Sequence, residues 1–211
     1  MVRGKKILIT CGPTWVAIDN VRVISNVSTG ELGHMLAEKL KKAGAIVTLI
    51  EGPVTHLLQD ASIQRIKFHY FSELKNILAK ELRKPYDCVI HAAAVSDYQL
   101  RTSSNDKISS GRRILALSLV PTPKLIETIK KINPKTFLVG FKLESNLTEN
   151  NLFKKTRALF ETARCDLLVA NSSHKNKYNA FIVSGYKEIL STHSDKKDLA
   201  KHLVNSLSCR L

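Results

Sequence analysis

The stretch Cys88–Ala92, with the sequence CVIHA, decides which fold class the chain can adopt. A short apolar run without polar alternation is typical of a strand buried on both faces, and such strands belong to parallel sheets covered by helices on both sides. Four further β-rich apolar runs are expected to be strands: Lys6–Thr10, Ile46–Ile50, Thr136–Phe141 and Leu167–Ala170. Another expected strand, Gln64–Phe71, alternates between polar and apolar residues.

Helical patterns separate these runs. In Glu31–Ala43 four long apolar side chains fall on one face, and Gly44 is a natural helix stop. The other expected helices are Ser72–Leu82, with Ser72 as its cap, Lys124–Lys131, Glu149–Ala163 and Asp195–Leu207. Because strands alternate with helices, the sequence predicts one domain, residues 1–211, of class α/β: a Rossmann-like three-layer sandwich with a mostly parallel sheet.

Two segments break the alternation. The polar stretch Gln99–Arg113 is followed by Ile114–Val120 (ILALSLV), an expected strand without a preceding crossover helix. Such a strand is expected to be antiparallel, in a small arm, and to lead into Thr122-Pro123 as a helix cap followed by proline at the first helical position. A hairpin is predicted later, from the strands on either side of Gly185–Lys187, namely Ala180–Ser184 and Glu188–Leu190.

Composition narrows the function classes. The chain has 211 residues, with 33 Lys and Arg against 18 Asp and Glu, and a formal charge of +15. The excess is dispersed and leans toward the C-terminal half, without a basic tail; it suits a solvated surface, or a site for polyphosphate ligands as well as nucleic acid. An apolar share of 44% excludes a disordered chain.

Cysteine spacing and apolar run lengths bear on the compartment. Cys11, Cys88, Cys165 and Cys209 are far apart and form no C-x-x-C pair, so neither a metal site nor a disulfide framework is indicated. The start, MVRGKKILIT, lacks the small-residue cleavage pattern of a signal peptide. No run approaches the ~20 apolar residues that cross a bilayer. We expect a cytoplasmic protein without membrane attachment.

The first candidate for chemistry is the connection Cys11–Gly30. Ligands of open parallel sheets bind outside the carboxyl ends of the strands, and this connection follows the first strand. It contains Gly12 but no G-x-G-x-x-G, and it ends in Asn26–Gly30 (NVSTG) before a helix. Hydroxyls and free N–H groups there can bind an anion, and Arg22 and Asn26 suit phosphate or carboxylate. Ordinary helix capping by the serine or threonine is the alternative.

Two more candidates follow later strands. In His91–Tyr98 (HAAAVSDY) small residues let a ligand approach the backbone, and Asp97 can accept from a hydroxyl or hold Mg²⁺. A packed turn capped by Asp97 is the alternative, and His91 is expected to be a buried strand residue. The loop Asp106–Arg113 places Lys107 among Ser and Gly, which suits either a charged lid or a disordered hairpin tip.

In this order, these motifs resemble those of phosphopantothenate–cysteine ligase, the phosphopantothenoylcysteine synthetase of coenzyme A biosynthesis. The matching stretches are Gly12–Thr14, Ala17–Asp19, Val21-Arg22, Ile24–Gly30, Ala92–Tyr98, Lys107-Ile108, Leu119–Pro123, Val139–Phe141 and Leu168–Asn171. The resemblance implies that the enzyme activates the carboxylate of 4′-phosphopantothenate as an acyl-nucleotidylate, with CTP or ATP and Mg²⁺, and then joins it to L-cysteine. It also implies a free-standing form without the flavin-dependent decarboxylase domain, and therefore without flavin.

The resemblance implies roles for single residues. Asn26 would hold the acyl-nucleotidylate, Arg22 lies in the same motif, and Lys107 would be the lid lysine; these three are the catalytic candidates. Ser28, Thr29 and Gly30 join Asn26 as substrate-binding candidates. The nucleotide-binding candidates are Gly12, Ala93, Ala94, Asp97, Lys107, Thr122, Pro123, Lys124, Leu125, Phe141, Asn171 and Asn179, and Asp97 is the metal candidate.

The chain also departs from the family pattern. Ser109 and Ser110 stand where bacterial members often have two lid lysines, and Arg112 and Arg113 are candidates to replace that charge. Helix lysines that the family has before the strand at 167 do not align: Lys154, Lys155 and Arg157 lie about one turn too early.

The nucleotide and the oligomer are expectations from the resemblance. Phe141–Glu144 resembles the eukaryotic, ATP-using branch, whereas chain length and Ser25–Gly30 suit bacterial, CTP-using members, and we expect CTP. Family members form homodimers, and an apolar strand at 114–120 suits an interface.

Two other classes compete with a ligase. A nucleotide- or nucleic-acid-binding basic module would explain the charge, but aromatic–basic clusters are missing and no nucleic-acid partner is expected. An NAD(P)-dependent oxidoreductase fits the fold but lacks both G-x-G-x-x-G and a Tyr-x-x-x-Lys pair.

Overall fold

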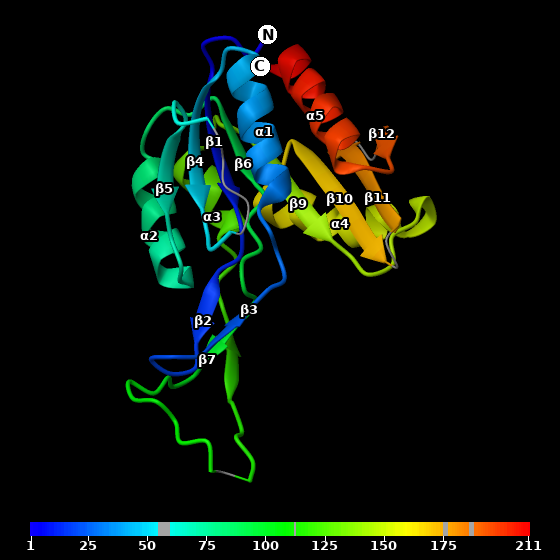
Figure 1. Cartoon of the computed structure of the whole chain (residues 1–211). Coiled ribbons are helices and arrows are strands. Elements are labelled where there is room, and N and C mark those ends of the chain that lie inside the picture. The colour runs from blue at the N-terminus through cyan, green and yellow to red at the C-terminus, as the bar shows by residue number, and fades with distance from the viewer. Residues whose placement is uncertain (55–59, 112, 175–176, 186–187) are drawn as a thin grey trace.

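The expected strand at Cys88 lies in the interior of the main sheet. The structure is a computed structural model that describes residues 1–54, 60–111, 113–174, 177–185 and 188–211. Its main-sheet strands are β1 (Lys6–Cys11), β4 (Ile46–Glu51), β5 (Gln64–Lys67), β6 (Cys88–His91), β9 (Phe137–Leu143), β10 (Leu167–His174), β11 (Lys177–Ser184) and β12 (Ile189–His193). Their order is β12-β11-β10-β9-β6-β1-β4-β5 (Figure 1).

The pairing pattern makes this a doubly wound sheet. From β5 to β10 all neighbouring strands are parallel, and only β11 and β12 are antiparallel additions at one edge. Counted along the chain, the six parallel strands follow the order 3-2-1-4-5-6 of dinucleotide-binding folds. The strand order therefore reverses between β1 and β6, and this switch point is where such sheets bind ligands.

Helices cover both faces of the sheet (Figure 1). They are α1 (Glu31–Lys42), α2 (Phe71–Glu81), α3 (Ile126–Ile132), α4 (Glu149–Ala163) and α5 (Lys196–Arg210). Strand side chains alternate between two buried clusters: Ile9 packs with α1 and α5, whereas Leu8 packs with α2, α3 and α4. The expected three-layer α/β fold is confirmed.

An arm extends beyond the carboxyl end of β1. It consists of residues 15–25, with the hairpin of β2 (Trp15–Ala17) and β3 (Val23–Ser25), and residues 98–121, with the pair β7 (Tyr98–Leu100) and β8 (Leu119–Pro121). β2 lies beside β7, and the loop between β7 and β8 projects farthest from the sheet (Figure 1). The expected small antiparallel arm is present.

Some expected boundaries were wrong. Only 119 and 120 of the expected strand 114–120 belong to β8, because β7 offers a partner of three residues. The expected strand 64–71 ends at Lys67, and α2 begins at Phe71, so Ser72 is not its cap; the Glu73 carboxylate accepts instead from the N–H groups of His69 and Tyr70.

The expected cap at Thr122 was also wrong. The helix that follows starts only at Ile126, and the Thr122 hydroxyl donates to the carbonyl of Ser96, 2.6 Å away, instead of capping a helix. Pro123 therefore stands before the helix and not in its first turn.

Near the C-terminus, the predicted hairpin and the predicted last helix are both present. β11 and β12 pair antiparallel as the predicted hairpin requires, although Tyr186 and Lys187 of its turn lie outside the described residues. Asp195 caps α5, because its carboxylate accepts from the N–H groups of Lys197 and Asp198. All four cysteines are free. Among the described helices, none is long and apolar enough to cross a membrane.

Candidate functional site at the sheet switch point

The loops that follow β1 and β6 are joined to each other. The N–H of Ala94 donates to the carbonyl of Gly12 over 2.8 Å, and the N–H of Thr14 donates back to the carbonyl of Ala94 over 3.3 Å. The buried Thr14 hydroxyl accepts from the N–H of Ser96 over 2.8 Å. Two candidate regions, 12–14 and 92–96, thus form one surface at the switch point, with Ala93 and Ala94 half-buried within it.

Two glycines of the site are required by packing. Gly12 and Gly30 have φ angles of 78° and 73°, in the region that favours glycine. A Cβ atom on Gly12 would lie 2.8 Å from Val54 Cγ1, and one on Gly30 would lie 2.4 Å from the same atom. Val54, which follows β4, can therefore pack against the end of β1 and the start of α1 only because both positions lack a side chain.

Asn26 bridges the first connection to the second. Its side-chain amide donates to the carbonyls of Ala94, 3.1 Å away, and Val95, 3.3 Å away. The side chain remains exposed, and these bonds fix its orientation. Ser28 and Thr29 lie between it and α1; of the two hydroxyls, that of Thr29 accepts from the N–H of Glu31 over 3.4 Å. The structure thus brings together the expected motif 26–30 and the expected loop 92–98.

Arg22 and Asp19 clamp the base of the expected lid. The Arg22 guanidinium donates to the Asp19 carboxylate, with Nε 3.0 Å from Oδ2, and also to the carbonyl of Ile108. The same Asp19 oxygen accepts from the N–H of Ile108 over 3.1 Å. In the sequence, Asp19 was only one residue of a motif. In the structure it binds Ile108, which lies 89 positions later in the chain.

The electrostatics of the clamp favour an ionised carboxylate. The Asp19 side chain has no exposed surface. Burial opposes its ionisation, but the N–H groups of Val21 and Ile108 and the Arg22 guanidinium outweigh that effect and hold the pKa of Asp19 well below its ordinary value. Lys107, next to the clamped Ile108, is exposed. Arg112 lies outside the described residues.

Asp97, Thr122 and Lys124 lie together on the other side of the switch point. The Lys124 ammonium is 2.5 Å from the Asp97 carboxylate, and both side chains are more than half exposed. The N–H of Thr122 donates to the carbonyl of Asp97 over 2.9 Å. Leu125, in contrast, packs into the core with 3% exposure, so its side chain does not face this surface.

The remaining candidates lie farther along the same edge of the sheet. Phe141 of β9 stands opposite Val169 in the register, while Asn171 and Asn179 stand on β10 and β11, one residue apart in register. Pro123 is exposed. The structure does not bring these residues into direct contact with Asn26 or Asp97 in any described interaction.

Two lysines pair with one glutamate near this edge, an arrangement that the sequence did not predict. The carboxylate of Glu144, just beyond β9, forms ion pairs with the ammonium groups of Lys142, 3.3 Å away, and Lys155, 3.0 Å away. Burial opposes ionisation of Glu144, but these two lysines outweigh it and lower its pKa. Lys155 from α4 therefore does reach the sheet edge, whereas Arg157 pairs with Glu161 on its own helix. The sequence shows Lys155 in an expected helix, but it does not show that Glu144 would be the partner of this lysine.

A cavity of about 610 Å³ opens at the start of α1. Residues from α1, β10, β11 and the start of α5 line it, including Glu31, Ser173, Tyr178 and Asp195. Its lining includes Glu31, which follows Gly30 in the sequence, but none of residues 26–30.

The structure disfavours a nicotinamide enzyme. Dinucleotide-binding folds place a free acidic residue after the second strand to bind the ribose. Here Glu51 ends β4, but it is 4% exposed and pairs with His34 at 3.1 Å and Arg65 at 3.9 Å. The connection from β1 to α1 also holds the β2–β3 hairpin instead of a tight glycine turn. His91, as expected, is a buried strand residue, and burial lowers its pKa to about 4.

The fold defines a doubly wound α/β protein, with a candidate ligand site at the switch point and no dinucleotide fingerprint. The chain belongs to the DNA/pantothenate metabolism flavoprotein C-terminal domain family, whose model matches residues 2–209. The family to which the sequence motifs pointed is thereby confirmed.

Individual relatives agree. Over 174 residues, 81% of this chain, it is 40% identical to the coenzyme A biosynthesis bifunctional protein CoaBC of Thermococcus kodakarensis, of which it covers 42%. The chain spans about half the length or less of this protein and of a second CoaBC relative, of which it covers 50%.

Solved structures show the same fold. The DNA/pantothenate metabolism flavoprotein of Streptococcus pneumoniae is 28% identical, with a TM-score of 0.88 over 99% of this chain and 100% of that one. A Cab2 mutant in complex with phosphopantothenate-cysteine is 19% identical, with a TM-score of 0.78 over 99% of this chain and 87% of that one; at this identity the likeness shows the fold alone.

Proposed function

We propose that the chain carries the phosphopantothenate–cysteine ligase activity of coenzyme A biosynthesis. The observation that carries the proposal is the bridge from Asn26 to the Ala94 and Val95 carbonyls, which joins the two most specific motifs at the switch point. The relatives named CoaBC support it. As the substrates we propose 4′-phosphopantothenate and L-cysteine, which the resemblance of the sequence motifs implies.

The reaction has two steps. A carboxylate oxygen of 4′-phosphopantothenate attacks the α-phosphorus of a nucleoside triphosphate, which forms an acyl-phosphate anhydride and releases pyrophosphate. The neutral amine of cysteine then attacks the acyl carbon; an amide bond forms, the nucleoside monophosphate leaves, and the amine proton passes to solvent. The first step is needed because a carboxylate has no good leaving group, whereas a phosphate ester anion is one.

The residues around Asn26 suit these steps. An amide whose orientation is fixed can hold the acyl-nucleotidylate without reorganisation. Ser28, Thr29 and Gly30 precede the positive end of α1, where a phosphate or carboxylate is favoured. Lys107 is exposed beside the clamped Ile108 and would neutralise charge on the bound anions. Because the Arg22 guanidinium already donates to Asp19 and to the Ile108 carbonyl, we propose that Arg22 positions the lid and does not bind the substrate.

The nucleotide would bind along the edge from Gly12, Ala93 and Ala94 to Asp97, Thr122 and Lys124, with Phe141, Asn171 and Asn179 beyond. We propose CTP as the nucleotide, with ATP as the alternative. A Mg²⁺ ion bound to the triphosphate would neutralise the developing charge. Asp97 fits as one protein ligand for such an ion, since Mg²⁺ commonly uses one or two carboxylates and takes its other ligands from phosphate and water.

The working enzyme would be a cytoplasmic homodimer. Support comes from the arm, where Ile114, Leu115, Leu117 and Leu119 are between 37% and 78% exposed. An apolar surface of this kind on a projecting segment suits a second copy of the same chain.

The test is pyrophosphate release by the purified chain from 4′-phosphopantothenate with CTP or ATP, first without and then with cysteine, and without added flavin. We expect about one equivalent of pyrophosphate per site in the absence of cysteine and continuous turnover in its presence. A folded chain that releases no pyrophosphate with either nucleotide would refute the proposal.

Asn26→Asp sharpens this test. A negative charge at this position would repel the substrate carboxylate and remove the donor to the Ala94 and Val95 carbonyls. A displacement of about 1 Å at the site typically costs about 10²-fold in rate. The matched control is Asn150→Asp, an exposed asparagine on α4. Equal turnover of Asn26→Asp and wild type would remove Asn26 from the mechanism.

A further inference from the structure

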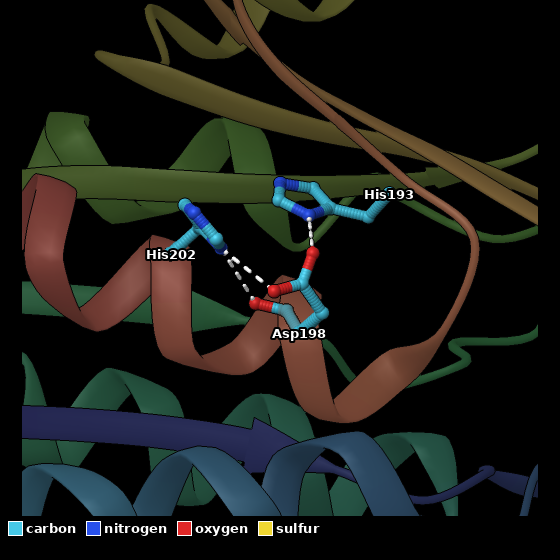
Figure 2. A group of neighbouring side chains, drawn as sticks. All are labelled: His193, Asp198 and His202. Carbon is cyan, nitrogen blue, oxygen red and sulfur yellow. Dashed lines mark hydrogen bonds and ion pairs between the residues drawn. The ribbon is translucent and has the colours of Figure 1, made fainter.

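Three side chains with metal-ligating atoms meet outside the switch-point site (Figure 2). They are His193, the last residue of β12, Asp198 in the first turn of α5 and His202 one turn later. His193 Nδ1 is 2.6 Å from Asp198 Oδ2, and His202 Nδ1 is 3.1 Å from Asp198 Oδ1. The ligand atoms lie within 4.8 Å of one another, and in the described part of the chain no other group of three meets this condition.

The backbone places these side chains on one another. Asp198 and His202 are four residues apart on α5, so they share a helix face. Asp195 fixes the start of that helix, because its carboxylate accepts from the N–H of Lys197 and of Asp198 at 2.8 Å each. His193, the last residue of β12, comes two residues before Asp195, and its side chain lies against the first turn of α5. The three groups therefore come from two packed elements and not from one mobile loop.

A second contact orients the buried histidine. His193 Nε2 lies 2.7 Å from the Ser191 hydroxyl, and the side chain of His193 is 1% exposed. A hydrogen bond at the outer nitrogen sets which ring nitrogen is free for a metal, and metal-bound histidines commonly have one. In the ion-free chain Nδ1 carries the proton that bonds to Asp198. A metal ion would displace that proton, and with Nε2 donating to Ser191 the Nδ1 lone pair would then serve as the ligand.

Exposure leaves one side of the group open. Asp198 is 42% exposed and His202 45% exposed. Two imidazole nitrogens and a carboxylate oxygen, with room for water, match a three-ligand site with an open fourth position. Hard cations such as Mg²⁺ and Ca²⁺ prefer sites built only from oxygen, whereas imidazole suits Zn²⁺.

We propose that His193, Asp198 and His202 bind a Zn²⁺ ion, which clips the edge strand β12 to the C-terminal helix. Tetrahedral zinc with bonds of ~2.0–2.1 Å sets its ligand atoms about 3.3 Å apart. To admit the ion, the separations of 2.6 Å and 3.1 Å from the two Asp198 oxygens would lengthen, and His202 Nδ1 would give up its 3.1 Å contact with the Asp198 backbone carbonyl.

This site is separate from the proposed ligase site. None of the three residues lines the 610 Å³ cavity, although Ser194–Lys197 between them do. The bound ion would act on stability, since a ligand that binds only the folded chain raises its melting temperature.

The test is zinc titration of the tag-free, chelator-treated full chain by calorimetry, with metal analysis after dialysis and melting temperatures in parallel. We expect one equivalent of Zn²⁺ per chain and a higher Tm with zinc. His202→Gln, at an exposed position, should weaken binding by about tenfold or more and abolish the Tm shift. Ser191→Ala, which removes only the orienting contact, should weaken binding about tenfold.

The control is His69→Gln, an exposed histidine away from the cluster, which should bind zinc like the wild type. The proposal fails if the wild type takes up no zinc, or if His202→Gln binds it as tightly as the wild type does. Both variants are compared by circular dichroism, and Asp198→Asn gives a second loss-of-ligand test.

Discussion

The main sheet and the arm are stabilised by different interactions. In the sheet, Ile7, Leu8 and Ile9 of β1 have no exposed surface, and burial on both faces supplies the stabilisation. In the arm, every residue of β3 is exposed, and Val27 beside it is fully exposed. The arm is held by the backbone pairing of β2 with β3 and of β7 with β8, and by the polar clamp from Asp19 and Arg22 to Ile108. The comparison teaches that a sheet stabilised by burial carries an arm held mainly by hydrogen bonds and an ion pair with a buried carboxylate.

The largest effect is expected in the sheet. Ile90→Ala removes a fully buried side chain from β6 and should lower the free energy of unfolding by about 2–5 kcal/mol, because it leaves a cavity. Urea unfolding measures it. Ile46→Ala, at a position of β4 that is 53% exposed, is the control and should cost about 0.5 kcal/mol or less. Equal losses would mean that burial does not separate these positions.

The clamp should affect activity more than stability. Asp19→Asn removes the charge that holds Arg22 and the N–H of Ile108, so the lid base should shift. A displacement of about 1 Å typically costs about 10²-fold in kcat. Steady-state turnover and Tm are the measurements, with Asp60→Asn as a control outside the arm. A large fall in Tm with unchanged kcat would reverse the assignment.

The clamp also has a definite pH dependence. The pKa of Asp19 is lower in the folded state than its ordinary value of about 3.9. Its contribution to stability is therefore complete above that pH and is lost only as pH falls toward the folded pKa. The amide shift of Ile108, followed by NMR from pH 7 to pH 3, should show no step near pH 4 while the chain stays folded; a step there would contradict the clamp.

The smallest effect concerns the outer face of the arm. If a second copy covers Leu115, then Leu115→Lys should raise the dimer dissociation constant about tenfold, which corresponds to about 1.4 kcal/mol. Light scattering across a dilution series measures it. Ile132→Lys, equally exposed but on α3, is the control and should leave the constant unchanged. A wild type that is monomeric at all concentrations would contradict the dimer.

Much of the fold was predictable because its signals are local. Apolar periodicity placed α4 at Glu149–Ala163, as the structure has it, and the continuous run at Cys88 identified a strand buried on both faces. The expectations that failed depended on partners. The Thr122 hydroxyl looked like a cap but bonds to Ser96, and the apolar run 114–120 forms a strand only where β7 is present to pair with it.

The candidate site shows the same division. The rule that ligands gather at strand ends selected Asn26, Ala94 and Asp97 as candidates, and the structure brings Asn26 into contact with Ala94. The clamp on Ile108 and the pairing of Lys155 with Glu144 could not be foreseen, because each joins loops or elements whose meeting depends on how the strands are ordered.

By itself, the sequence determined the α/β class, the positions of the buried strands and the motifs that lie at their ends. These follow from side-chain periodicity and residue type, which act over a few neighbouring residues. Only the tertiary structure decided the strand order, the antiparallel pairing of β11 with β10, the Asp19 clamp and the meeting of His193 with Asp198 and His202. Hydrogen bonds and ion pairs between distant residues form only once the core has brought their elements together.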